Sequence, residues 1–374
     1  MKTEVKINSN ILTWAIARAG FDLVDFTNRV PNVRKWIDGE KNPTVSQLKN
    51  FSKKVYIPFG YLFLDEHPKE EIPIPFFRTD NNNTKLSINT YDTILLLQRR
   101  QDWLKNYLLD GDAEELPFVG KFKDSKDVYN IVKDIRKILG LKECWAGEFK
   151  TWQDALNHLT EQIEECGIIT VFNGVVGNNT KRKIPVDECR GFVLVDKIAP
   201  FLFINNSDSK AAQMFTLVHE LAHIWTGHSA GFDFRTLMPA DDPVERICDK
   251  VAAEFLVSEQ IFNEMWDKNP DIKKSAKFFK VSELVIARRA LDAGKINKKQ
   301  FFDFYDEYSD KYFRRKKDRS TGGDFYATTR KRLSITFASH INNAVKSGSL
   351  LYRDACKLTG LKGDTFQYFL TKYI

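Results

Sequence analysis

The sequence has no run of roughly 18 apolar residues, the length needed to span a bilayer, so we expect no membrane helix. Its first residues, Met1-Lys-Thr-Glu-Val-Lys, lack the apolar stretch of a secretory signal. Cysteine is scarce: five residues are scattered along the chain, and none forms a Cys-x-x-Cys pair. These absences exclude a disulfide framework and a thiolate metal site, and they predict a protein of the reduced cytoplasm.

The chain does contain enough apolar residues to build several cores. Of its 374 residues 43% are hydrophobic, and this length exceeds what one core usually serves, so we expect roughly two to four domains.

The charge of the chain is unevenly distributed. Residues 311–374 hold 14 Lys and Arg against 4 Asp and Glu, which is a net charge of +10. The whole chain has a net charge of +7, so the first 310 residues carry a net charge of −3. A basic tail on a mildly acidic body suggests an anionic partner, of which nucleic acid is the commonest.

A short stretch predicted to be helical, Thr216–Gly227, carries the strongest chemical signal. It contains His219, Glu220 and His223 in the order His-Glu-x-x-His. Because positions i and i+4 lie on one helical face, the two imidazoles can bind one metal ion, and Glu220 lies beside them where it can act on a metal-bound water. The alternative is a helix with two solvent-facing or internally hydrogen-bonded histidines, and the flanking sequence decides between the two.

A catalytic zinc site needs a third protein ligand and an open position for water. The extended metzincin motif requires Gly and His at two later positions, which here are Thr226 and Ser229. The gluzincin arrangement is present instead, because the next predicted helix, Pro243–Val257, contains Glu245-Arg-Ile-Cys-Asp249. The i, i+4 spacing places both carboxylates on one face, so Glu245 is predicted to bind the metal and Asp249 to accept the ring N–H of a ligating histidine.

Four stretches of the sequence resemble the ImmA/IrrE family of zinc metallopeptidases: Arg190–Asp196, Ala199–Asn205, Asp208–His223 and Glu245–Val257. The strong part of the resemblance covers roughly residues 165–260. It implies His219, His223 and Glu245 as zinc ligands and Glu220 as the catalytic residue, in agreement with their spacing. Members of this family are bacterial or phage cytoplasmic proteins that control repressors, often by cleaving them, and some are encoded as antitoxins beside a toxin.

Residues 8–65 are predicted to form short helices separated by Gly, Asn and Pro. Trp36, Gly39 and Pro43 match the Trp-x-x-Gly-x-x-x-Pro pattern of Xre-type helix-turn-helix repressors. This resemblance implies a DNA-reading helix at about residues 31–38. Its outward-facing, DNA-contacting residues would be Asn32, Arg34 and Lys35. The second helix departs from the small residues usual in those repressors, which leaves an alternative: a helical module that only packs on the next domain or on a partner.

A small sheet is predicted in front of the metal-binding helix. The predicted strands are Ile168–Asn173, Gly191–Asp196 and Phe201–Asn205, and Gly174–Asp187 is predicted to be an exposed loop. The edge formed by the last two strands is predicted to hold a peptide substrate as an added strand. An oxyanion donor is also required, and the sequence leaves His228, Arg190 and a Tyr from elsewhere open; of these, His228 is the catalytic candidate.

Two further segments are basic. Residues 272–296 read as helix, turn and helix with Arg288 and Arg289 on the second helix, and we favour a structural role behind the peptidase core over a second DNA-reading unit. In the tail, the candidates for nucleic-acid contact are Arg314, Arg315, Lys316 and Lys317. The same residues suit docking onto an acidic protein such as a cognate toxin, and the remaining alternative is a solvated basic face.

These features predict a mostly helical α+β protein whose peptidase domain is zincin-like, of gluzincin type, with a small sheet. The predicted domains are an Xre-like helix-turn-helix domain (1–70), a helical linker region (71–150), a zinc metallopeptidase domain (151–265), a helix-turn-helix-like extension (266–310) and a basic helical C-terminal domain (311–374). The predicted function is a regulatory metallo-endopeptidase that uses Zn²⁺ to cleave a specific cytoplasmic protein such as a repressor, with DNA as a further partner. The alternative is a non-catalytic antitoxin or transcriptional regulator that uses the same fold to bind a toxin and DNA.

Overall fold

The structure is a computed structural model that describes residues 3–69, 76–77, 86–232, 242–315 and 325–374. The side chains of 76–77, 230–232, 310–315 and 325–327 lie outside this description. The chain divides into two units, residues 1–73 with 84–92 and residues 74–83 with 93–374. Within the described residues, no helix is both long enough and apolar enough to cross a membrane.

The first unit forms its core from apolar residues at helical spacing. Its elements are α1 (Ser9–Arg18), α2 (Leu23–Arg29), α3 (Pro31–Ile37), α4 (Val45–Lys54) and the 3-10 helix η1 (Phe59–Phe63). Leu12, Ile16 and Phe51 are buried in one cluster. Asp22 begins α2 by accepting the N–H of Asp25, and Thr44 begins α4 in a capping box. The short helices of this unit therefore form where the sequence predicts them.

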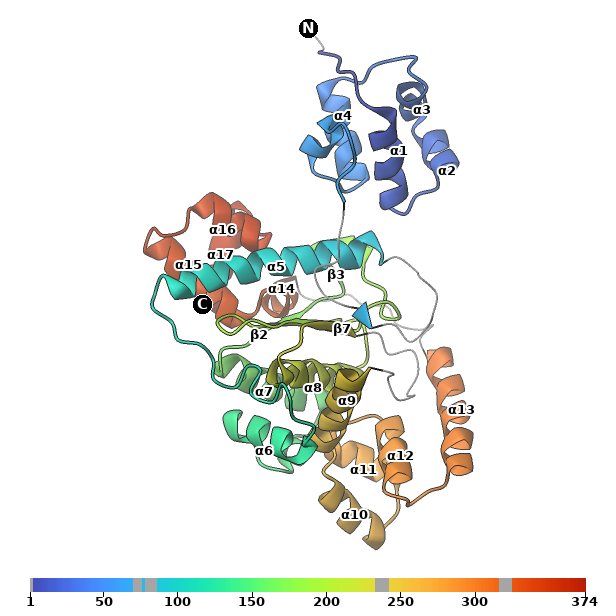
Figure 1. Ribbon diagram of the computed structural model, residues 1–374, viewed down its shortest axis with the longest axis vertical. Coiled ribbons are helices and arrows are strands. Elements are labelled where there is room, and N and C mark those ends of the chain that lie inside the picture. The colour runs from blue at the N-terminus through green and yellow to red at the C-terminus, as the bar shows by residue number, and fades with distance from the viewer. Residues whose placement is uncertain (1–2, 70–75, 78–85, 233–241, 316–324) are drawn as a thin grey trace. The chain divides into compact units, whose positions relative to one another are not determined.

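A five-stranded sheet is the centre of the second unit (Figure 1). Its strands, in spatial order, are β1 (Phe76–Phe77), β7 (Ala230–Phe232), β5 (Gly191–Leu194), β6 (Phe201–Ile204) and β2 (Ile169–Phe172). β2 runs parallel to β6, β5 runs antiparallel to both of its neighbours, and β1 runs parallel to β7. Every residue of β2, β5 and β6 is buried, as expected for strands covered by helices on both faces.

Two predictions about the strands are wrong. Residues 174–187 are not simply a loop, because β3 (Val175–Val176) and β4 (Asn179–Lys183) form an antiparallel hairpin there. The two-residue turn Gly177-Asn178 is a hairpin signal that the basic composition of β4 obscured; most of β4 is exposed, so its charges stay in water. The predicted substrate-binding edge is also wrong, since β5 and β6 both lie inside the sheet, and β7 covers the outer side of β5.

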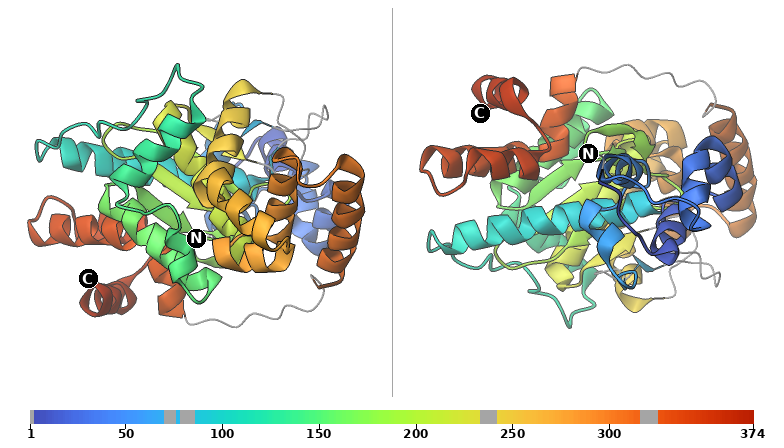
Figure 2. Two further views of the ribbon diagram at one scale, coloured as in Figure 1. Left: turned by 90° about the horizontal axis from the view of Figure 1, so that it is seen from below. Right: turned by 90° about the horizontal axis from the view of Figure 1, so that it is seen from above.

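Helices cover both faces of the sheet, with α7 and α8 on one side and α5 and α14 on the other (Figures 1 and 2). The helices that follow the first unit's elements in the chain are α5 (Ile88–Leu109), α6 (Val128–Ile138), η2 (Trp145–Glu148), α7 (Trp152–Glu165), α8 (Lys210–Thr226), α9 (Pro243–Leu256), α10 (Glu259–Lys268), α11 (Ile272–Phe279), α12 (Glu283–Asp292), α13 (Lys298–Arg315), α14 (Phe325–Leu333), α15 (Ile335–Lys346), α16 (Tyr352–Thr359) and α17 (Gly363–Tyr373). The side-chain amide of Gln101 ties α5 to the sheet by donating to the carbonyl oxygens of Leu194 and Ala199, each at 2.8 Å.

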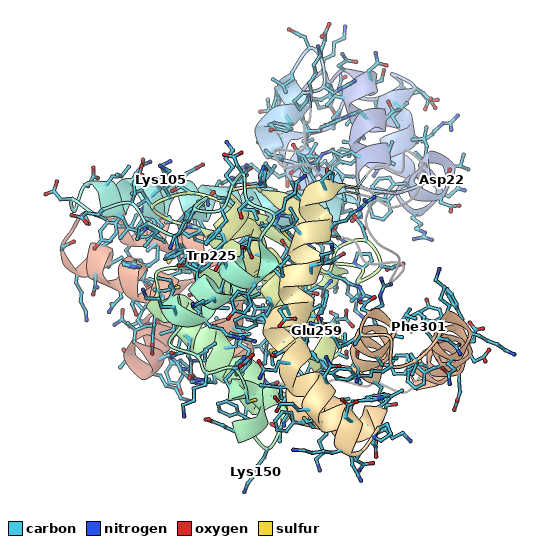
Figure 3. The ribbon with its side chains drawn as sticks, turned by 60° about the horizontal axis from the view of Figure 1, so that its bottom comes forward. Asp22, Lys105, Lys150, Trp225, Glu259 and Phe301 are labelled. Atoms are coloured by element: carbon cyan, nitrogen blue, oxygen red, sulfur yellow. The ribbon has the colours of Figure 1, made fainter. Side chains whose placement is uncertain are left out.

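The main core lies between the sheet and the layer of helices that contains α8. Trp225 of α8 lies within that layer (Figure 3), where its ring stacks on Phe118 with 4.5 Å between centroids. Its indole N–H donates to Asp134 Oδ2 at 2.9 Å, so the polar edge of the buried ring is satisfied. The same cluster extends into α11 and α12 through Phe279 and Ile286. Helices α11 and α12 therefore share a core with the sheet and α8.

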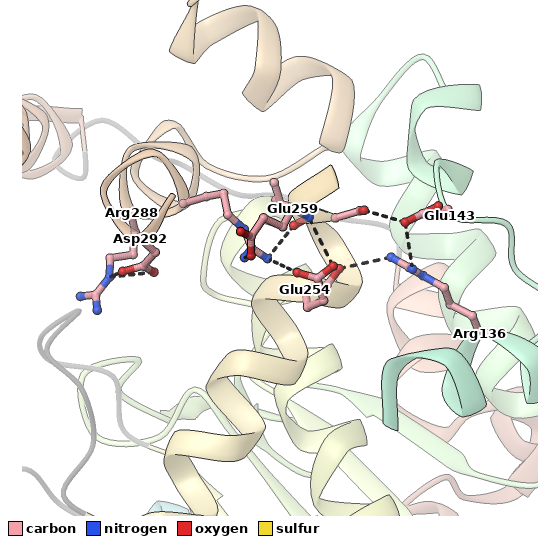
Figure 4. A network of polar contacts seen from close by, with 9 residues as sticks. Arg136, Glu143, Glu254, Glu259, Arg288 and Asp292 are labelled. Atoms are coloured by element: carbon pink, nitrogen blue, oxygen red, sulfur yellow. Dashed lines mark hydrogen bonds and ion pairs between the residues drawn. The ribbon is translucent and has the colours of Figure 1, made fainter. Parts of the chain in front are cut away.

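A polar network joins the end of α9 to the helices around it (Figure 4). Arg289 of α12 donates to Glu254 Oε2 at 2.9 Å, and Arg136 of α6 donates to the main-chain carbonyl of Glu254 at 3.2 Å. Arg288 pairs with Asp292 of its own helix at 3.0 Å. Both α12 arginines are thus engaged within the protein, which supports a packing role for this helix pair over a DNA-reading role.

Candidate metal centre

Helix α8 places the metal-binding motif in the interior of the second unit. Ser209 begins the helix by accepting the N–H of Ala212 at 3.2 Å, and Gly227 ends it in the left-handed conformation with φ of 75°. All residues from Thr216 to Thr226 are buried. The helix is mostly apolar on every side, which is the pattern of a central helix and not of a surface helix.

Polar atoms of three side chains on α8 and α9 converge on one point. His219 Nε2 lies 3.0 Å from Glu245 Oε2, His223 Nε2 lies 3.2 Å from His219 Nε2, and the same atom of His223 lies 3.2 Å from Glu245 Oε1. The two imidazoles are fully buried and the carboxylate is 2% exposed. Metal ions in proteins are usually held by side chains of His, Cys, Asp or Glu. Among the described residues, His219, His223 and Glu245 form a group of such side chains that could hold a metal ion.

The spacing of these atoms fits zinc. Zn–N and Zn–O bonds of about 2.0–2.1 Å at a tetrahedral angle separate the ligand atoms by roughly 3.3–3.4 Å. The observed separations, 3.0 to 3.2 Å, two of which involve different oxygens of Glu245, are close to the edges of such a tetrahedron. Two imidazole nitrogens and a carboxylate are also a donor set that zinc prefers in catalytic sites. The residues present therefore fit a zinc ion.

The charges of the site also favour a cation. Burial alone lowers the pKa of His219, but its hydrogen bonds to Asp249 and Glu245 outweigh burial and raise that pKa to about 10. Burial acts against the charged form of Glu245, yet hydrogen bonds from the two histidines hold its pKa well below the ordinary value. Two carboxylates thus stabilise positive charge at His219, and a divalent metal satisfies the same requirement.

Asp249 orients the first histidine. Its Oδ1 lies 3.0 Å from His219 Nδ1, on the side of the ring opposite to the cluster. An N–H on Nδ1 that donates to this carboxylate leaves the lone pair of Nε2 for the metal. Helix α9 therefore contributes the carboxylate of Glu245 to the cluster and, one turn later, a carboxylate beside His219 Nδ1.

Glu220 lies on α8 beside the ligands and is fully buried. Neither carboxylate oxygen has a hydrogen-bond partner among the described residues, and burial raises the pKa of Glu220 well above its ordinary value. Strand β5 passes directly over this carboxylate: a Cβ on Gly191 would lie 3.2 Å from Glu220 Oε1 and 2.5 Å from Thr216 Cγ2. Gly191 is not among the residues predicted for the site, although glycine inside a buried strand signals a close approach of the backbone.

The proposed oxyanion donors differ in their surroundings. The main-chain N–H of His228 donates to the carbonyl of His223 at 3.1 Å, which places the residue just beyond the end of α8. Burial lowers the pKa of His223, and the nearby His228 acts in the same direction. Arg190 instead forms an ion pair with Asp208 at 3.5 Å, which holds its guanidinium at that carboxylate. The role of His228 as the oxyanion donor stays a prediction.

The candidate nucleic-acid residues lie far from this cluster in sequence. Asn32, Arg34 and Lys35 are exposed on α3, and Arg34 pairs with Asp38 at 2.8 Å. Arg314 and Arg315 end α13, but their side chains are not among those described. Lys316 and Lys317 lie outside the described residues. The role of all these residues stays a prediction.

The buried His-Glu-x-x-His helix, the glutamate-bearing helix that follows it and the sheet in front are consistent with a zincin-like fold. Residues 166–291 match the family model of the IrrE N-terminal-like domain, peptidase M78, which supports the resemblance of this part of the chain to the ImmA/IrrE family of zinc peptidases. Residues 333–372 match a domain of unknown function, DUF8813. No curated protein and no solved structure matches the chain.

Proposed function

We propose that the protein is a regulatory zinc metallo-endopeptidase that cleaves a specific cytoplasmic protein, such as a repressor. The observation that carries the proposal is the convergence of His219, His223 and Glu245 at separations of 3.0 to 3.2 Å. The buried carboxylate of Glu220 lies on the same helix as the two histidines. A purely structural cluster would not need a second, unpartnered carboxylate at this place. A regulatory role agrees with the matched family and with the additional unit that precedes the peptidase part.

Each residue of the site has a chemical role in this proposal. A zinc ion held by His219, His223 and Glu245 supplies Lewis acidity, which lowers the pKa of a water and polarises a peptide carbonyl. Glu220 would accept the proton of the attacking water and later donate it to the leaving amine. Burial raises the pKa of Glu220 above its ordinary value, which is the direction that helps a carboxyl group donate a proton to the leaving amine. His228 would donate a hydrogen bond to the developing oxyanion.

The first unit adds a second component to the proposal. We propose that α3 contacts DNA through Asn32, Arg34 and Lys35, which share the exposed side of that helix. Phosphate contacts by basic residues supply most sequence-independent affinity for DNA. A protein that binds DNA and cleaves a repressor or a related partner would act where that partner is bound.

The burial of the site favours a second candidate function. His219, Glu220 and His223 are 0% exposed, so the described form of the protein leaves no open approach to the metal ligands. A non-catalytic antitoxin or transcriptional regulator that uses the metal fold as a scaffold would need no such approach. The two functions differ in one observable: the proposed peptidase cuts its partner, and the scaffold only holds it.

The Glu220→Gln variant separates these functions. It keeps the size and burial of the side chain but removes the proton acceptor, so we expect zinc content and thermal stability to stay unchanged and cleavage of the partner to fall by about 10³-fold or more. The partner is first identified as the protein that the variant retains, and its cleavage by the wild type is then followed by mass spectrometry. Glu148→Gln, the same change at an exposed position, is the matched control and should leave cleavage unaffected.

Two results would count against the peptidase. If the wild type leaves the retained partner intact for as long as the variant does, the scaffold function holds. If the variant cuts the partner as fast as the wild type, Glu220 is not the proton acceptor.

A further inference from the structure

A cleft of about 580 Å³ lies between helices α9 and α12. One face of α9, from Arg246 to Val257, forms one wall, and one face of α12, from Val285 to Asp292, forms the other. Phe215 of α8 and Val128 of α6 complete the lining, and like Val285 they are only half-buried, so part of the surface of the cleft is apolar. Sites for small molecules typically have volumes of roughly 300–1,000 Å³ and a largely apolar lining.

The cleft is separate from the metal cluster, but one residue belongs to the surroundings of both. The proposed zinc ligands and Glu220 do not line the cleft, whereas Asp249 does. Asp249 Oδ1 lies 3.0 Å from His219 Nδ1, and the side chain of Asp249 is 25% exposed. The same carboxylate therefore contacts a metal-binding histidine and borders the cleft.

Ion pairs within the lining offset most of its charges. The two arginines of α12 pair with Glu254 at 2.9 Å and with Asp292 at 3.0 Å (Figure 4). Glu259 lies 3.7 Å from one of these arginines. Which ligand the cleft favours therefore depends mainly on its other charged residues, which all belong to α9.

Those other residues are Arg246, Asp249 and Lys250. Asp249 is engaged with His219, while Arg246 and Lys250 are exposed and lie one helical turn apart on the same wall. The two cations directly follow Glu245 and Asp249 in the sequence, so their charges lie close to the metal cluster. Two cations beside an apolar surface match a ligand that has an anionic group and an apolar body.

We propose that this cleft binds a small organic anion, with a carboxylate or phosphate group at Arg246 and Lys250 and an apolar body against the apolar side chains of the lining. The bound anion raises the affinity of the metal centre for zinc, because it offsets two positive charges beside that centre. Binding of the anion goes beyond the proposed function, and only its effect on zinc rests on the proposed metal centre. The alternative is a gap between two packed helices that holds only water.

The test uses the full-length protein and anilinonaphthalene sulfonate, a fluorescent anion with an apolar ring system. In the variant Arg246→Gln/Lys250→Gln the cleft loses both cations. The matched control Lys133→Gln/Lys137→Gln removes two exposed charges one turn apart on α6, outside the cleft. We expect a fluorescence titration to show saturable binding to the wild type and the control, with affinity at least about fivefold weaker in the cleft variant.

A second variant fills the cleft and leaves its charges unchanged. Ala253 is half-buried on the α9 wall, so Ala253→Phe should place a ring in the cleft and abolish binding of the probe, while thermal unfolding shows that the variant is folded. Octanoate and octyl phosphate should displace the probe from the wild type, and octanol, which has the same chain without the charge, should not. The anion that displaces the probe at the lower concentration identifies the preferred group.

Zinc affinity provides the second measurement. Competition with a chromophoric chelator should show that a saturating concentration of the probe strengthens zinc binding by about two- to threefold in the wild type and not in Ala253→Phe. Zinc should strengthen binding of the probe to the wild type by the same factor, because coupling between two sites is reciprocal.

Three results would contradict the proposal. Equal affinity of the probe for the wild type, Arg246→Gln/Lys250→Gln and Ala253→Phe would overturn the site, and displacement by octanol as effective as by octanoate would overturn the anionic group. Zinc affinity that is unchanged or weaker with the probe bound would overturn the coupling. Binding of the probe needs neither zinc nor catalysis, so a failure of the metal centre or of the peptidase function would show in a zinc titration without the probe or in the Glu220→Gln experiment.

Discussion

At the scale of single residues, Gly191 decides how closely the sheet approaches the catalytic candidate. The backbone of β5 reaches Glu220 because position 191 has no side chain, and a Cβ there would lie 2.5 Å from Thr216 Cγ2 and 2.9 Å from the carbonyl oxygen of Phe203. Both atoms belong to the packed core, so neither can move freely. The carboxylate of Glu220 is thereby held between its own helix and β5.

Gly191→Ala tests this constraint. We expect the added methyl group to destabilise the protein by about 1–3 kcal/mol through overpacking and to lower the rate of partner cleavage while zinc affinity stays within about twofold. Urea unfolding and a zinc competition assay measure the two properties separately. Adding Thr216→Ser removes the methyl group in the closest contact and should recover part of the stability. Full stability and activity in Gly191→Ala alone would show that the strand has room to move away.

The residues of the metal cluster could be identified from sequence, whereas Gly191 was missed. His219, Glu220 and His223 are fixed by helical spacing, and Glu245 and Asp249 repeat that spacing on the next helix, so local geometry alone predicts which side chains share a face. The role of Gly191 depends on the packing of a strand against a helix, and this contact between separate elements leaves only a weak local signal.

At the scale of elements, the helices were predictable because their ends carry capping residues. Asp22, Thr151 and Ser209 each accept a hydrogen bond at the start of a helix, at the places where the sequence indicates a helix start. Short strands carry no comparable signal. β7 has three residues and β1 has two, so each depends on the pairing partner that the fold provides. This is why the sheet edge was predicted wrongly.

Helix α3 is the element on which the proposed DNA contact depends. Lys35 is exposed on it, and we expect Lys35→Ala to weaken binding to duplex DNA about equally for all sequences and to reduce the slope of log Kd against log salt by roughly 0.9. Lys54→Ala, a change of the same charge at the end of α4, is the control. Fluorescence anisotropy at several salt concentrations measures both. Salt-independent binding, or equal effects of the two variants, would contradict a phosphate contact by α3.

At the scale of the whole molecule, one buried arginine connects α5 to the C-terminal helices. Arg100 is 3% exposed, and it donates to the carbonyl oxygen of Leu358 at 2.9 Å and to that of Arg332 at 3.1 Å. Its guanidinium lies 5.7 Å from the ring centre of Phe337. Burial lowers the pKa of Arg100 to about 10, so it stays protonated at neutral pH. The segment that matches DUF8813 is thus anchored to the helix that covers the sheet.

Arg100→Met should weaken this anchor. The change removes the donor from the carbonyl groups of Leu358 and Arg332 and the charge from a buried position, and we expect a loss of about 2–4 kcal/mol in the free energy of unfolding. Limited proteolysis should then release the C-terminal helices faster than in the wild type. Arg99→Met, at the exposed neighbouring position, is the matched control and should change the free energy by less than about 0.5 kcal/mol. Equal stability of the two variants would show that the contacts of Arg100 are not required.

The central claim is that His219, His223 and Glu245 form a zinc site, and the most direct test is the zinc stoichiometry and affinity of the full chain. Native mass spectrometry and competition with a chromophoric chelator should show one zinc per wild-type chain, with affinity about 10–100-fold weaker in Asp249→Asn because the orientation of His219 is lost. Glu245→Gln, which removes a ligand, should lose affinity by a larger factor, and the exposed control Glu259→Gln should bind as the wild type does. A wild-type protein that binds no zinc, or a Glu245→Gln variant that binds it equally well, would contradict the account.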